Sequence, residues 1–191
     1  YRRSYDDIAD DLASADVVVA WSLNADQIKA ARRLRWIHST AAAIHQLLIP
    51  EIVNSDIILT NASSVHGPVV AEHVLSLMFA LAKHLPAAFR FQQQHQWGQD
   101  AMAHRQPPIR ELRDSTLGIV GVGEIGGHVA RIASTIGMPV IAVRHNVEKG
   151  VDWLDRNDPM RSRHRVYSPK DVKRMLAESD FVVLSAPVTS Q

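Results

Sequence analysis

The chain has 191 residues, of which 46% are hydrophobic and 21% are charged, and it contains no cysteine. This composition is typical of a globular protein and excludes disulfides and thiolate metal sites. The formal net charge of +1 lacks the basic excess of nucleic-acid-binding proteins, and no apolar run approaches the roughly 20 residues that a membrane span needs. Because the chain start also lacks the apolar segment of a signal peptide, we expect a cytoplasmic protein that binds neither nucleic acid nor membrane.

Short apolar runs alternate with helical patterns over the first ninety residues. The predicted strands are residues 15–21, 34–38 and 57–60. The predicted helices are residues 6–13, residues 24–33 with Asn24 as N-cap, a short helix over 44–48 that ends near Pro50, and the long helix 69–90. The long helix is apolar on most sides, which indicates burial, and Pro86 is expected to kink or break it near its end. The alternation predicts a parallel sheet and the α/β fold class.

A polar segment, residues 91–115, follows the long helix. It is rich in glutamine and contains Pro107-Pro108, and it is too long for an ordinary connection. We therefore expect an arm that wraps a partner or links two domains. Trp97 within it needs an apolar docking surface, which a second subunit could supply.

The strongest motif lies in residues 116–146, where a strand, a glycine turn, a helix and a second strand follow one another. The strand 117–120 leads into Gly121-Val122-Gly123-Glu124-Ile125-Gly126, residues 128–136 show one apolar helix face, and residues 139–143 form the second strand. In this context the spacing G-x-G-x-x-G is the fingerprint of a dinucleotide-binding site, although such glycines could also serve packing alone.

Each glycine of the motif has a physical role in binding a dinucleotide. Gly121 permits the tight turn, Gly123 lets the backbone approach a pyrophosphate, and Gly126 lets helix and strand pack closely. The amides of Glu124 and Ile125 open the helix, where free N–H groups and the helix dipole favour an anion.

The remainder of the chain continues the α/β pattern. Residues 147–165 are charged and loop-like, and residues 166–167 could form a short strand. Ser168 is the predicted cap of a helix over 169–177, and residues 180–187 form a buried strand whose C-terminal end should open onto the cofactor crevice.

Three blocks of the chain resemble the D-isomer-specific 2-hydroxyacid dehydrogenase family. They are Asn61 followed by Val70-Ala71-Glu72-His73, the block 117–126, and the block 180–189. The resemblance implies a flavodoxin-like substrate domain followed by a Rossmann-type cofactor domain, both incomplete here, with the site between them. By this resemblance residues 1–90, with a hinge helix over 69–90, belong to the substrate domain, residues 91–115 form a connecting and dimerisation arm, and residues 116–191 form the NAD(P)-binding domain. The family usually forms dimers, so a homodimer is expected.

The resemblance implies an NAD(P)-dependent oxidoreductase that interconverts a small 2-keto acid and its D-2-hydroxy acid, similar to glyoxylate and hydroxypyruvate reductases. The catalytic Arg, Glu and His of the family lie further along the chain than Gln191, so no catalytic residue is assigned in this chain. We therefore expect the sequence to be part of a longer protein, with the first strand of the substrate domain also missing before Tyr1.

In the family, the loop after the second strand binds the substrate carboxylate through backbone amides. By position, the amides of Ala42 and Ala43 would do so here. Family members commonly have Gly and Asp where this chain has Ala43 and His45. Backbone amides do not depend on the side chain, so the role is retained, but the loop shape is expected to differ because Ala adopts positive φ less easily than Gly.

The residues after the second cofactor-domain strand bear on the choice of cofactor. An NAD site places Asp or Glu there to bind the ribose 2′-hydroxyl, whereas this chain has Arg144-His145-Asn146 and no carboxylate before Glu148. Arg can bind a 2′-phosphate bidentately, so NADP is favoured over NAD, with Arg144 and His145 near the adenosine ribose. Alternatively, Arg144 merely lies at a solvated strand end. The nicotinamide is expected near Ala186 and Pro187.

The sequence also bears on other functions. The ten histidines include no H-E-x-x-H motif, and Pro68 interrupts any shared helix between His66 and His73, so no metal site is expected. A redox sensor or corepressor could use the same fold to bind a dinucleotide and a protein without turnover. A methyltransferase usually needs an acidic residue at the end of the second strand, where Arg144 stands.

Overall fold

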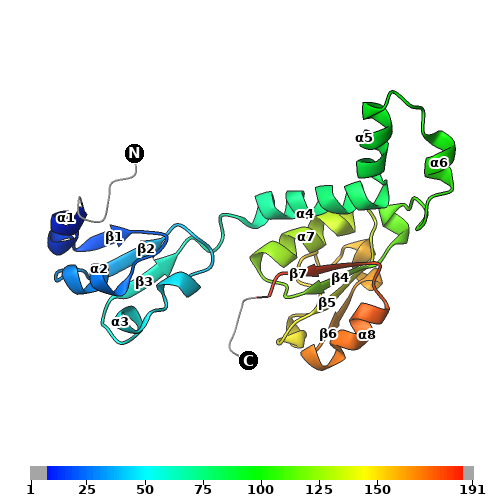
Figure 1. Cartoon of the computed structure of the whole chain (residues 1–191). Coiled ribbons are helices and arrows are strands. Elements are labelled where there is room, and N and C mark those ends of the chain that lie inside the picture. Colours follow the sequence, from blue (N-terminus) through cyan, green and yellow to red (C-terminus); the bar gives the residue numbers. More distant parts are fainter. Residues whose placement is uncertain (1–7, 187–191) are drawn as a thin grey trace. The chain divides into compact units, whose positions relative to one another are not determined.

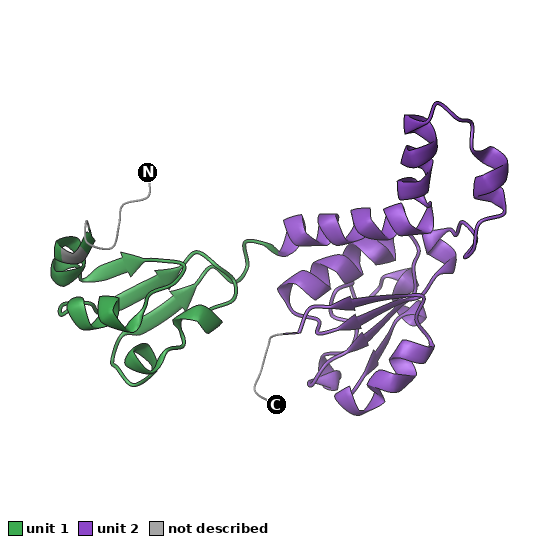
Figure 2. Cartoon of the chain, in the orientation of Figure 1, with its two compact units in different colours: residues 1–66 green, residues 67–191 purple. Residues whose placement is uncertain are grey.

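The computed structural model describes residues 8–186, which divide into two compact α/β units on either side of the boundary between His66 and Gly67 (Figure 2). Both sheets are parallel, which confirms the predicted fold class. The boundary between the units falls at His66 and Gly67 and not after residue 90. The long helix belongs to the second unit because it packs along the helix that follows the glycine turn.

The first unit is a three-stranded sheet with short helices. Its strands are β1 (Val17–Val19), β2 (Trp36–Ser39) and β3 (Ile58–Asn61), in the order β1-β2-β3. Its helices are α1 (Ala9–Ser14), α2 (Ala25–Ala30), α3 (Pro50–Val53) and the 3-10 helix η2 (His45–Leu47). Ile37 at the centre of β2 is fully buried and packs in one cluster with Val18 of β1 and Leu59 of β3.

Two local predictions in the first unit are confirmed. Asn24 is the N-cap of α2: its side chain accepts from Gln27 N–H at 2.8 Å, and the Gln27 side chain accepts from Asn24 N–H at 2.9 Å. The short helix predicted over 44–48 is η2, which ends at Leu47 before Pro50, and Pro50 itself begins the next helix, α3. The first helical residues have unpaired N–H groups in any case, so proline is tolerated there.

The second unit has four parallel strands. They are β4 (Leu117–Val120), β5 (Val140–Val143), β6 (Arg165–Tyr167) and β7 (Phe181–Leu184), in the order β6-β5-β4-β7. Counted from β4 along the chain, this is the order 3-2-1-4 of the first four strands of a Rossmann sheet. The order reverses between β4 and β7, and a crevice at the C-terminal ends of such strands is where α/β proteins bind ligands.

Helices cover both faces of this sheet (Figure 1). On one face α7 (Glu124–Thr135) packs on the sheet, with α4 (Gly67–Ala82) along it, and on the other lies α8 (Val172–Ala177). The side chains of β5 alternate accordingly: Val140 and Ala142 pack in the α4–α7 core, whereas Ile141 and Val143 pack against Met175 of α8.

The predicted helix 69–90 is two helices. α4 ends at Ala82 and α5 (Leu85–Gln93) begins after His84, whose φ of 51° is left-handed. The break expected near Pro86 is therefore confirmed, and it comes just before the proline, which itself lies in the first turn of α5. Within residues 8–186 no single helix is long and apolar enough to cross a membrane, and only the pair α4 and α5, bent by 66°, meets that test jointly.

The segments predicted as loops contain further short helices. They are α6 (Gln99–Ala103) in the arm, and the 3-10 helices η3 (Leu112–Asp114), η4 (Val147–Lys149) and η5 (Pro159–Arg163). The helix predicted over 169–177 is the 3-10 helix η6 (Pro169–Asp171) followed directly by α8. Ser168 is the N-cap residue of η6, with Pro169 at the first helical position as predicted, but its hydroxyl donates to the Asp171 carboxylate at 2.6 Å and does not accept from a backbone N–H of the helix start, and α8 begins only at Val172.

Candidate functional site

The glycine turn joins the ends of three strands. Gly121 follows β4 with a φ of +89°, which L side chains rarely adopt, and a Cβ there would lie 2.8 Å from backbone atoms of Ala186 after β7. Its N–H donates to the carbonyl of Val143 at 2.9 Å, and its carbonyl accepts from Ser185 Oγ. The turn is therefore held between β5 and β7, at the point where the strand order reverses.

The start of α7 faces open space. Gly123 is the N-cap, and a Cβ built on it would meet no atom within 4 Å. The first helical hydrogen bond runs from Gly127 N–H to the Gly123 carbonyl at 2.8 Å, so the N–H groups of Glu124 and Ile125 precede it and point out of the helix start. Gly126 is buried, and a Cβ on it would collide with the Gly121 carbonyl. This geometry fits an anion at the helix start.

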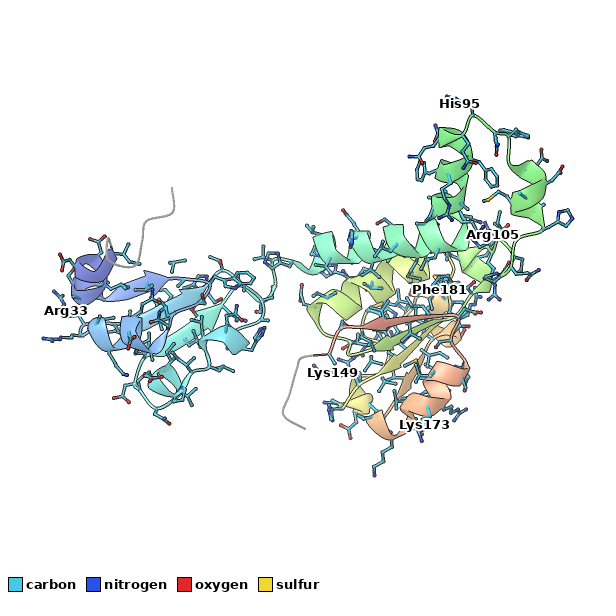
Figure 3. All side chains as sticks on the ribbon, in the orientation of Figure 1. Arg33, His95, Arg105, Lys149, Lys173 and Phe181 are labelled. Atoms are coloured by element: carbon cyan, nitrogen blue, oxygen red, sulfur yellow. The ribbon has the colours of Figure 1, made fainter. Side chains whose placement is uncertain are left out.

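A pocket of about 300 Å³ lies beside the turn. The face of α7 that points into it carries Glu124, His128 and Arg131, one helical turn apart. Arg144 enters from the end of β5, and Lys149 and Asp152 enter from the segment that follows. Figure 3 labels Lys149 on the second unit. The other lining residues are Val122, Gly123, Gly127 and Trp153.

Arg144 is held firmly in this pocket. Its Nη1 lies 2.6 Å from Asp152 Oδ1, its Nη2 lies 3.4 Å from the Val122 carbonyl, and its side chain is only 11% exposed. Arg144 therefore does not lie at a solvated strand end. His145, predicted beside it, is exposed and is not among the residues that line the pocket.

Sequence reasoning missed Asp152. A dinucleotide site is expected to have its acidic residue directly after β5, whereas Asp152 comes eight positions after Arg144. The turn of η4 and Gly150, whose φ is +56°, brings it back to the strand end. A glycine seven residues beyond the end of β5 is a weak signal in the sequence, because the path of the loop decides the contact.

The end of β7 meets the glycine turn as described, with Ala186 against Gly121. Ala186 was predicted near the nicotinamide together with Pro187. Pro187 lies outside the described residues.

The predicted substrate loop follows β2 in the first unit. Ser39, fully buried at the end of β2, accepts from Ala41 N–H at 3.2 Å, and Asn61 at the end of β3 donates its side-chain N–H to the Ala42 carbonyl at 2.6 Å. Within residues 8–186 the amides of Ala42 and Ala43 donate to no protein acceptor. Two free amides on an anchored loop suit a carboxylate.

The histidines and carboxylates do not gather into a metal site in the described part of the chain. Among residues 8–186 no three His, Asp or Glu side chains lie close enough to share a metal ion.

Comparison with known proteins identifies relatives over nearly the whole chain. The sequence profile of "D-isomer specific 2-hydroxyacid dehydrogenase, NAD binding domain" matches residues 75–191. D-3-phosphoglycerate dehydrogenase of Synechocystis sp. is 28% identical over 168 residues, with 86% of this chain and 27% of that protein covered. Hydroxypyruvate reductase of Thermotoga maritima is 26% identical over 190 residues, with 96% of this chain and 55% of that protein covered.

A solved structure agrees with these matches. A D-isomer specific 2-hydroxyacid dehydrogenase family protein from Aeromonas salmonicida has a TM-score of 0.76 and 28% identity, with 96% of this chain and 54% of that chain covered. The chain thus spans from about a quarter to just over half of the length of these relatives. Because the profile covers more than half of the chain and includes the glycine turn at the strand-order reversal, this chain belongs to the D-isomer-specific 2-hydroxyacid dehydrogenase family.

Proposed function

We propose that the full-length protein is an NAD(P)-dependent oxidoreductase that interconverts a small 2-keto acid and its D-2-hydroxy acid. The observation that carries this proposal is the glycine turn at the reversal of strand order, with an open helix start directly after it. Relatives named hydroxypyruvate reductase and glyoxylate reductase support the substrate class.

The residues of the second unit fit a bound dinucleotide. When bound, the nicotinamide would supply or accept the hydride at carbon 2 of the acid. The amides of Glu124 and Ile125 would bind the pyrophosphate, and Gly123 would allow its close approach. Ala186 and, outside the described residues, Pro187 would flank the nicotinamide, and His145 would lie near the adenosine ribose.

NADP is the proposed preference. Arg131, Arg144 and Lys149 line one pocket beside the helix start, and a 2′-phosphate is the group of the cofactor that such cations would bind. NAD lacks this phosphate and would therefore gain less binding affinity from these three cations.

The first unit would bind the substrate through its backbone. Ala42 and Ala43 would donate their amides to the carboxylate, while Asn61 and Ser39 hold the loop in place. The catalytic Arg, Glu and His that the family resemblance implies are not assigned to residues of this chain.

A homodimer is the proposed assembly. Helices α5 and α6 enclose an apolar hollow of about 870 Å³, whose lining includes Phe91, Met102 and Ile109. Trp97 at its rim is 90% exposed. An exposed tryptophan beside an apolar hollow is typical of a surface that a partner covers. A second copy of this arm would supply both a hollow for this Trp97 and a Trp97 for this hollow.

The direct test is a titration of the full-length protein with NADPH and NADH, followed by glyoxylate, hydroxypyruvate and pyruvate while the nicotinamide absorbance is recorded. We expect tighter binding of NADPH and oxidation of the cofactor by at least one acid. Arg144→Asp should weaken NADPH binding about tenfold or more, because a charged hydrogen bond is replaced by repulsion. Arg156→Asp, an exposed residue outside the pocket lining, is the matched control.

Two results would change this proposal. Binding without turnover on any of the acids would favour the redox sensor or corepressor. The absence of any dinucleotide binding would contradict the role of residues 121–126.

A further inference from the structure

We infer that Asp152 is a specificity-determining residue that opposes the NADP preference conferred by Arg144. The carboxylate would repel a 2′-phosphate and would accept hydrogen bonds from the ribose hydroxyls of NAD. The inference rests on the proposed function, because it concerns the adenosine end of the same dinucleotide site.

The pocket brings together cations from three separate elements. Arg131 comes from α7, Arg144 from the end of β5, and Lys149 from η4. Lys149 is exposed and, among residues 8–186, forms no ion pair, so its charge is available to a ligand. The Nε of Arg131 reaches the carbonyl of Trp153 at 3.4 Å, which ties α7 to the segment that carries Asp152.

The two carboxylates of the pocket have different partners. Glu124 belongs to the helix start, and its Oε1 lies 3.3 Å from His128 Nε2 of the same helix. Asp152 instead pairs directly with Arg144. Asp152 is therefore the acidic group that competes with any ligand for the guanidinium of Arg144.

The exposed fractions of the Arg144 and Asp152 side chains indicate which of the two can move when a ligand binds. Arg144 is 11% exposed and is also held near the Val122 carbonyl, whereas Asp152 is 40% exposed on a loop. A phosphate that reached Arg144 would lie within a few ångströms of the carboxylate, and like charges at that distance repel strongly in a partly desolvated pocket. A ribose diol in the same place carries no charge and offers two O–H donors to the carboxylate.

The sequence pattern and the structure thus lead to different expectations. Arg144 alone predicts NADP, and the Arg144–Asp152 pair predicts a protein that also accepts NAD. Removal of the carboxylate should leave three cations around the pocket and make the protein strongly selective for the 2′-phosphate.

The test uses the full-length protein and two probes for the adenosine half of the cofactor, 2′,5′-ADP and 5′-AMP, with affinities measured by calorimetry. Asp152→Asn should raise the ratio of the affinity for 2′,5′-ADP to that for 5′-AMP about tenfold or more. NADPH and NADH should show the same change in ratio. Asp155→Asn, an exposed acid three residues away that does not line the pocket, should leave the ratio unchanged.

Two further variants separate this role from a structural one. Asp152→Ser removes the charge with a different side chain and should reproduce the shift. Adding Arg144→Ala to Asp152→Asn should abolish most of the gain, because the freed guanidinium is what the phosphate binds.

An unchanged ratio in both Asp152 variants, or an equal loss of both affinities, would overturn the inference while leaving the proposed function intact. If the unmodified protein bound neither the two probes nor either dinucleotide, the proposed function itself would fall, and this inference with it.

Discussion

At the scale of single residues, His164 is the most constrained titratable group in the second unit. Its side chain is 5% exposed, its Nδ1 accepts from Val140 N–H at 3.0 Å at the start of β5, and its ring contacts Trp153 edge-on. Burial lowers the pKa of His164 below its ordinary value, and Arg161 and Arg163 act in the same direction against Asp158. The native state therefore requires the neutral imidazole, since a protonated Nδ1 could not accept from Val140.

The pH dependence of stability should reveal this residue. Above the ordinary histidine pKa, His164 is neutral in both the folded and the unfolded state, so its contribution to the free energy of unfolding is fully present. As the pH falls below about 6.5, the unfolded state binds a proton that the folded state does not, and the free energy of unfolding should fall by up to about 1.4 kcal/mol per pH unit until the folded pKa is reached.

The measurement is urea unfolding at about pH 7.5 and about pH 5.5 for the unmodified protein and for His164→Asn. Asparagine retains an acceptor near the position of Nδ1 but does not titrate. The free energy of unfolding should change less between the two pH values in the variant than in the unmodified protein. An identical pH dependence in both proteins would contradict the role given to His164.

At the scale of elements, the glycine turn and α7 form the best-defined part of the site. Gly121 and Gly126 are required by backbone contacts, whereas Gly127, the next residue of the helix, has no atom within 4 Å of a built Cβ. Two adjacent glycines on one helix thus differ in what surrounds them.

This difference predicts opposite effects of the same substitution. Gly126→Ala should lower the free energy of unfolding by roughly 1–3 kcal/mol, because the new methyl group collides with the Gly121 carbonyl, and it should also weaken dinucleotide binding. Gly127→Ala should be neutral or stabilising by up to about 1 kcal/mol, because alanine favours the helix. Chemical denaturation of both variants checks this, and equal changes in the free energy of unfolding of the two would contradict the role given to the close approach at Gly126.

At the scale of the whole molecule, the arm of α5 and α6 presents the apolar hollow and Trp97 to the surroundings. If a second copy covers this surface, Trp97 is the residue whose loss should weaken the assembly most, because buried tryptophans dominate interface energies.

Sedimentation equilibrium of the full-length protein tests the assembly. Trp97→Ser should raise the dimer dissociation constant about tenfold or more. Trp21→Ser, also an exposed tryptophan at 64% but in the first unit, should leave it unchanged. A monomeric unmodified protein, or equal effects of the two substitutions, would contradict the proposed dimer.

The sequence by itself determined the α/β class, the strands and the position of the glycine turn. These features depend on local patterns: β5 is a continuous apolar run because helices cover both its faces, Asn24 caps α2 through contacts three residues away, and Gly121 takes a φ that other residues avoid. Such signals lie within a few residues of the structure that they specify, so they can be read without a fold.

The tertiary structure alone decided where α4 belongs, where the long helix breaks and which carboxylate meets Arg144. Each depends on residues that are distant along the chain or on the path of a loop. Helix α4 joins the second unit through its packing on α7, and the chain breaks at the left-handed His84, so that α5 begins at Leu85, one residue before the proline. Asp152 reaches Arg144 because the chain turns back at Gly150, and no spacing rule includes that turn. The physical reason is that a local sequence pattern specifies a helix or a strand, whereas contacts between distant elements determine which charged side chains lie together in the dinucleotide pocket.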